Sequence, residues 1–68
     1  MPYRVLKMTA TGNLDDDMVR TKQRAMEIAQ SHCQKIWNSA EIVRYARGEE
    51  TTIMRYWRDT NGMSYIEY

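Results

Sequence analysis

The sequence contains one cysteine, one histidine and no long apolar segment, and each shortage excludes a class of protein. The single cysteine, Cys33, cannot form a disulfide bond within the chain. Its neighbour His32 has no second His or Cys with which to complete a tetrahedral set, so we expect no metal ion and no cofactor. No segment approaches the roughly 20 apolar residues of a membrane-spanning helix, so we expect no membrane partner.

A strong charge of either sign is also absent. Lys and Arg number 10 and Asp and Glu number 9, which gives a formal net charge of +1. This balance is not typical of proteins that bind nucleic acid mainly by neutralising phosphates. The first ten residues include Arg4 and Lys7 and lack the apolar segment of a signal peptide. Together with the free cysteine, this predicts a cytoplasmic protein.

The chain is short, at 68 residues, which predicts a single domain over residues 1–68. A domain of this size buries only about 60% of the surface that its unfolded chain exposes, so its stability is marginal. Small proteins often gain stability from disulfides, a metal or a partner subunit. Because the first two are excluded here, we expect a macromolecular partner or a homodimer.

The hydrophobic pattern predicts an α+β domain with the element order β-α-β-β-β. Alternating apolar residues indicate a first strand, and an apolar stripe with a helical repeat follows it. The expected architecture is one helix packed on one face of a mostly antiparallel four-stranded sheet, with the first two strands parallel. The predicted strands cover residues 3–11, 41–47, 51–58 and 63–68, and the predicted helix covers residues 14–36.

The predicted helix begins with an acidic cluster. Asn13 is a good N-cap residue, and Asp15, Asp16 and Asp17 would occupy the first helical turn. Negative charge there is favourable beside the positive end of the helix dipole. An acidic contact for a basic partner is the alternative role for the three aspartates.

No catalytic residues are expected. His32 and Cys33 are the one pair that suggests a base and a nucleophile, but neighbouring helix residues point about 100° apart and cannot easily share a substrate. Cys33 falls on the apolar stripe with Ala25 and Ala29, so we expect it to be a buried structural residue. The sequence therefore predicts a protein that is not an enzyme.

The later strands are apolar in both alternations, although a single helix can cover only one face of a sheet. We assign the alternation that contains Val43, Met54 and Tyr56 to the helix side, because the other contains arginines. The expected uncovered face then includes the apolar residues Val5, Ile42 and Ile53. The residues predicted to bind a partner on this face are Tyr3, Arg44, Arg55, Trp57 and Tyr65.

An exposed combination of aromatic, aliphatic and arginine side chains is typical of protein interfaces and their energetic centres. Contiguous patches of this kind usually mark contact sites. A homodimer that hides the patch is the alternative, because two-fold pairing is the commonest form of assembly.

Single-stranded nucleic acid is the second candidate partner. Bases can stack on an aromatic and arginine-rich sheet, and the side chains for this role would be Trp57, Tyr65, Arg44 and Arg55. Acidic residues are interspersed among the later strands, however, and no basic stripe is present. We therefore favour a protein or ribonucleoprotein complex as the partner over nucleic acid alone.

The helix segment Ala25-Met26-Glu27-Ile28-Ala29 with Cys33, followed by three short strands and a glycine-bearing hairpin, resembles small phage-borne β-α-β-β-β proteins, some anti-CRISPR proteins among them. The resemblance implies a non-enzymatic inhibitor, encoded by a phage or mobile element. Such an inhibitor binds a host surveillance complex that targets nucleic acid and blocks access of the target DNA.

The order of helix and strands is also similar to that of dodecins, which are flavin-binding oligomers of similar length. Their flavin stacks on a tryptophan that follows the helix, and Trp37 follows the predicted helix here. Trp37 falls in a predicted loop rather than a strand. The dodecin-like reading is therefore the third alternative.

Overall fold

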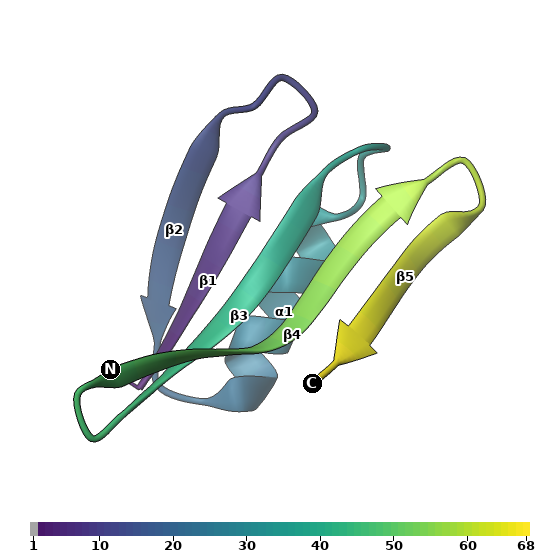
Figure 1. Cartoon of the computed structure of the whole chain (residues 1–68). Coiled ribbons are helices and arrows are strands. Elements are labelled where there is room, and N and C mark those ends of the chain that lie inside the picture. The colour runs from purple at the N-terminus through teal and green to yellow at the C-terminus, as the bar shows by residue number, and fades with distance from the viewer. Residues whose placement is uncertain (1) are drawn as a thin grey trace.

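The computed structural model describes residues 2–68, and its element order is β-β-α-β-β-β. The five strands form one antiparallel sheet in the order β2-β1-β3-β4-β5, with the helix behind it (Figure 1). The predicted α+β class with one helix is confirmed, whereas the predicted four-stranded sheet is wrong. The elements are β1 (Tyr3–Met8), β2 (Leu14–Val19), α1 (Lys22–His32), β3 (Ser39–Ala46), β4 (Glu49–Asp59) and β5 (Gly62–Glu67).

The additional strand, β2, occupies the segment that was predicted to begin the helix. It pairs antiparallel with β1 from Met8 opposite Leu14 to Tyr3 opposite Val19. Because β2 reverses the chain before the helix, β1 also pairs antiparallel with β3. The predicted parallel pairing of the first and second strands is therefore wrong, and the whole sheet is antiparallel.

The three aspartates lie in this edge strand and not in the first turn of a helix, so their predicted role beside the helix dipole is wrong. Lys7 Nζ lies 2.8 Å from Asp17 Oδ2 and 3.6 Å from Asp15 Oδ2. The hydrogen bond to Asp17 raises the pKa of the Lys7 amine above its ordinary value. Asp16 points to the opposite face, toward Arg4. These partners lie on the neighbouring strand β1, outside the segment that carries the capping signal, which is why that signal was misleading.

The helix begins later than predicted, after Thr21. The Thr21 backbone is extended, and its Oγ1 accepts a hydrogen bond from the Arg24 N–H at 3.1 Å, which is the geometry of an N-cap. The helix is 11 residues long and ends at the C-cap residue Cys33. Its predicted apolar stripe is confirmed for Ala25, Ala29 and Cys33, which are fully buried. It is wrong for Met18 and Ile36, at the two ends of the predicted helix, which are 44% and 49% exposed.

The core lies between this stripe and one face of the sheet. Val5, Ile42, Met54 and Tyr56 form the sheet side of the core and are at most 1% exposed. The prediction was correct for Met54 and Tyr56. It was wrong for Val5, Ile42 and Ile53, which were expected on the uncovered face but contribute to or pack against the core, and for Val43, which was expected on the helix side but lies on the opposite face. The reason is register: Ile42 lies opposite Met54, and a shift of one residue between two strands exchanges the faces of every side chain on one of them.

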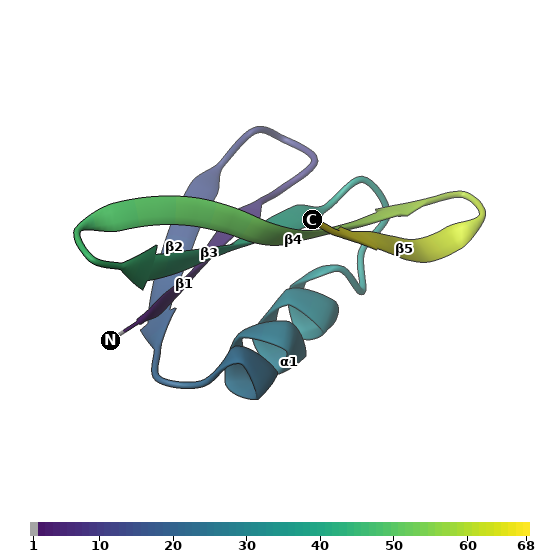
Figure 2. The ribbon, with the colours of Figure 1, turned by 60° about the horizontal axis from the view of Figure 1, so that its bottom comes forward.

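The helix covers only part of the sheet. Its backbone lies closest to β1 and β3, while the β4–β5 hairpin extends past it (Figure 2). The ribbon of residues 2–68 places no element over the opposite face of the sheet (Figure 2). Within the described chain, no helix combines the length and the apolar character that crossing a membrane requires.

Candidate binding face

The uncovered side of the sheet is called the open face here. The strand registers align Leu6, Glu41, Arg55 and Ile66 in one row across β1, β3, β4 and β5. A neighbouring row aligns Met8 with Ser39 and Ser39 with Trp57. Alternation along each strand defines the open face as Arg4, Leu6, Met8, Leu14, Asp16, Met18, Ser39, Glu41, Val43, Tyr45, Arg55, Trp57, Ser64 and Ile66.

The structure brings together only some of the residues that the sequence predicted for this face. Arg55 and Trp57 lie on it, as expected. Tyr3 packs against the core, and the Tyr65 ring stacks on Tyr56 of the helix side, with ring centroids 5.5 Å apart. Arg44 lies opposite Tyr3 in the register and so shares its side of the sheet. The predicted placement on the open face is therefore wrong for Tyr3, Arg44 and Tyr65.

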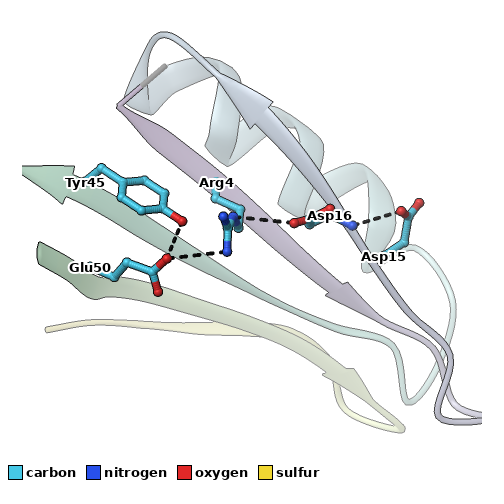
Figure 3. Close-up of polar contacts among 5 residues, drawn as sticks. All are labelled: Arg4, Asp15, Asp16, Tyr45 and Glu50. Atoms are coloured by element: carbon cyan, nitrogen blue, oxygen red, sulfur yellow. Dashed lines mark hydrogen bonds and ion pairs between the residues drawn. The ribbon is translucent and has the colours of Figure 1, made fainter. Parts of the chain in front are cut away.

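One end of the open face is neutralised by contacts within the chain (Figure 3). Arg4 Nη1 lies 3.5 Å from Glu50 Oε1, and Arg4 Nε lies 3.4 Å from Asp16 Oδ2 without the geometry of a hydrogen bond. The Arg4 guanidinium also lies over the Tyr45 ring, 5.1 Å from its centroid. The Tyr45 hydroxyl donates to Glu50, and this hydrogen bond raises the pKa of Tyr45. Charges at this end are therefore already paired.

The other end of the open face contains two adjoining hollows. The first has a volume of about 220 Å³ and is called the apolar hollow; it is lined by Leu6, Met8, Leu14, Ser39, Glu41 and Arg55. The second has a volume of about 380 Å³ and is called the tryptophan hollow; it is lined by Trp37, Asn38, Ser39, Arg55, Trp57, Arg58 and Asp59. Because both hollows are lined in part by Ser39 and Arg55, they adjoin each other, and the two together are called the recess.

Trp37 was not among the predicted docking residues, and its backbone is unusual. Its φ angle is 71°, in the left-handed region that bulky residues rarely adopt, although 63% of its surface is exposed. Such a conformation costs about 1–3 kcal/mol and persists only where neighbouring contacts impose it. Two backbone hydrogen bonds impose it here, from the Trp37 N–H to the Arg58 carbonyl at 2.7 Å and from the Arg58 N–H to the Asn38 carbonyl at 3.2 Å.

Asn38 is the buried polar residue that holds this loop in place, with 7% of its surface exposed. Its Oδ1 accepts a hydrogen bond from the Ala10 N–H at 3.2 Å, and its Nδ2 donates to the His32 carbonyl at 2.9 Å. The side chain therefore ties the β1–β2 connection and the end of α1 to the start of β3. This network gives the tryptophan hollow a rigid wall.

Cys33 and His32 have structural roles in the folded protein. Burial raises the pKa of the Cys33 thiol, and the positive charge of Arg58 opposes that shift only in part. Arg58 Nε donates to the Cys33 carbonyl, while His32 Nε2 lies 2.8 Å from the Met8 carbonyl. Cys33 is buried, as expected, and a buried protonated thiol is a poor nucleophile. Among residues 2–68, no three His, Cys, Asp or Glu side chains gather closely enough to hold a metal ion.

The chain matches no protein-family model, no curated protein and no solved structure at a significant level. The resemblances to anti-CRISPR proteins and to dodecins were based partly on one strand before the helix, whereas the structure has two. Both resemblances stay predictions of the sequence.

Proposed function

We propose that this protein is a non-enzymatic binding protein that docks another protein against its open face. The observation that carries the proposal is the uncovered side of the sheet, where an apolar hollow adjoins a hollow lined by two tryptophans and two arginines. Recessed apolar and aromatic surface with arginine at its border has the composition of interface centres.

Several apolar side chains on this face are exposed in the isolated chain. Met8 is 45% exposed, Leu14 is 64% exposed and Met18 is 44% exposed, and they lie on the two neighbouring strands β1 and β2. Contact with another protein would remove this surface from water. Burial of apolar area stabilises a complex by about 25 cal/mol for each Å². The complex with a partner would therefore gain affinity from this apolar area.

The charge distribution favours a protein over a duplex nucleic acid. The net charge is +1, and Arg4 and Lys7 are already paired with acidic side chains. Binding that depends mainly on phosphate neutralisation needs several free cations along one surface. The resemblance to anti-CRISPR proteins implies that the partner is a host defence complex, and such a complex is the first partner to test.

The test uses a partner identified by affinity capture from the native host and then purified. Leu14→Asp, in the apolar hollow, should weaken binding to this partner at least tenfold. Ile36→Asp is the matched control, because Ile36 is also an exposed apolar residue, 49% exposed, but lies outside the open face. Equal affinities for the two variants would contradict the proposal.

Homodimerisation gives a different result. A concentration-dependent shift in size-exclusion chromatography that Leu14→Asp removes would show that the open face is occupied by a second copy of the chain. A monomer at all concentrations leaves the face available for another protein.

A further inference from the structure

The tryptophan hollow combines features that differ from those of the apolar hollow beside it. Trp37 and Trp57 supply two indole rings, and Arg55 and Arg58 outnumber the single acidic residue, Asp59. The Asp59 carboxylate is already engaged, since its Oδ1 accepts a hydrogen bond from the Asn61 N–H at 2.8 Å. The hollow therefore offers aromatic surface together with excess positive charge.

Arg55 is the cation that remains available for a ligand. Within residues 2–68 its guanidinium forms no ion pair, although Glu41 lies directly opposite it in the register. The side chain is exposed, and it stands at the border of the hollow. Arg58, in contrast, uses its Nε to hold the Cys33 carbonyl.

Trp37 is held in an exposed position although its backbone conformation is energetically unfavourable. A packing role does not explain this, because most of its surface is exposed. Strained residues of this kind concentrate at binding sites, where a ligand benefits from a side chain that is fixed in advance. The fixed position comes from its hydrogen bond to β4, next to Trp57.

We propose that the tryptophan hollow binds one unpaired nucleotide of a single strand, with the base stacked on Trp37 and the phosphate paired with Arg55. Base stacking on aromatic side chains is largely independent of sequence. An arginine guanidinium matches the geometry of a phosphate, and a volume of about 380 Å³ lies within the usual range for small-ligand sites. The inference goes beyond the proposed function, because it assigns a ligand of another class to a distinct part of the recess.

The first experiment compares a fluorescently labelled single-stranded 12-mer with the same sequence as a duplex, using fluorescence anisotropy. The single strand should bind at least about fivefold more tightly, because stacking requires an unpaired base. Equal affinity for the duplex, or no binding of the single strand, would overturn the proposal.

The second experiment separates binding from structure with Trp37→Gly. Glycine adopts a positive φ without strain, so this variant should unfold at the same temperature as the wild type or higher. It should nevertheless bind the single strand at least about fivefold more weakly. The matched control is Arg47→Gly, which also replaces a residue with positive φ, here 53°, but lies in the β3–β4 turn away from the hollow. Unchanged binding by Trp37→Gly, or an equal loss with Arg47→Gly, would contradict the assignment.

The salt dependence of single-strand binding tests the phosphate contact separately. Arg55→Gln should reduce the slope of log affinity against log salt by about 0.7, the value for one phosphate contact to a single strand. An unchanged slope would show that Arg55 does not pair with the phosphate. Because Leu14→Asp tests protein docking in the other hollow, failure of either proposal can be recognised separately.

Discussion

The two faces of the sheet consist of alternate residues of the same strands, and these residues differ in burial. On the helix side, Val5, Ile42, Met54 and Tyr56 are at most 1% exposed and pack against small helix residues. On the open face, the alternate residues of those strands include Leu6, Arg55 and Trp57, which line hollows that reach solvent. The comparison teaches that the residues that form the core and the residues that line the hollows alternate along the strands, so one set can be changed with little effect on the other.

The largest expected effect on stability is at Met54 of β4, and its neighbour Arg55, which points to the opposite face, provides the comparison. Met54→Ala should lower the free energy of unfolding by about 2–5 kcal/mol, because it leaves a cavity in the core. Arg55→Ala should change it by about 0.5 kcal/mol or less, as is usual for exposed positions. Urea unfolding followed by circular dichroism measures both. Similar losses for the two variants would mean that the faces are not divided in this way.

A smaller effect is expected at Asn38, where the core meets the wall of the tryptophan hollow. Asn38→Ala leaves the Ala10 N–H and the His32 carbonyl without their partner and should cost about 1–3 kcal/mol. Asn38→Asp retains an acceptor for Ala10, but it buries a carboxylate whose second oxygen faces the His32 carbonyl, so it should be at least as damaging as Asn38→Ala. Thermal unfolding of the two variants checks this order, and a clearly milder effect of Asn38→Asp would show that the hydrogen bond to the His32 carbonyl contributes little.

The buried thiol predicts a dependence of stability on alkaline pH. Because burial raises the pKa of Cys33 above its ordinary value of 9.0, the unfolded chain loses this proton first. The stabilisation that comes from the raised pKa of Cys33 is complete below that value. It is lost as the pH rises above it, by at most about 1.4 kcal/mol per pH unit. Wild-type unfolding free energy should therefore fall more between pH 8 and pH 10 than that of Cys33→Ala. Parallel curves would contradict this expectation.

The smallest effect is expected in the acidic edge strand. Asp17→Asn should lower stability by up to about 1 kcal/mol, because Asp17 lies 2.8 Å from Lys7 Nζ and is 43% exposed. Asp15→Asn should have less effect, since its distance is 3.6 Å and it is 78% exposed. Differential scanning calorimetry can rank the two. Equal and negligible effects, combined with weaker partner binding, would support the predicted role of the aspartates as an acidic contact.

Local sequence signals predicted the elements that local interactions determine. The stripe of Ala25, Ala29 and Cys33 identified the buried side of the helix, because a repeat of 3.6 residues is visible in the sequence. The expected glycine-bearing hairpin is the β4–β5 hairpin, in which Gly62 follows Asn61 and has a φ of 111°. Both signals involve residues that are close together in the chain.

The segment from Leu14 to Val19 was misassigned because its strand partners lie across a turn, on β1, and are not part of the helix-start pattern itself. Asn13 followed by three aspartates is typical of a helix N-terminus, whereas Thr21 is the residue that caps the helix. The signal for a strand was the pairing of Asp15 and Asp17 with Lys7, which becomes visible only when β1 and β2 lie side by side.

The candidate site was predicted only in part for the same reason. Arg55 and Trp57 were assigned to the open face correctly, because their strand alternates clearly around Met54 and Tyr56. Tyr65 was placed on the wrong side, since it lies opposite Tyr56 and stacks on it. Trp37 could be placed in a loop from the sequence, but its positive φ depends on hydrogen bonds to Arg58.

The sequence alone determined the α+β class, the single buried helix stripe and the presence of more apolar residues than one helix can cover, because these follow from composition and short-range periodicity. The tertiary structure decided the fifth strand, the register and the identity of the open face. These depend on which strands pair and in what alignment, and an alignment shifted by one residue reverses the faces without any change in composition.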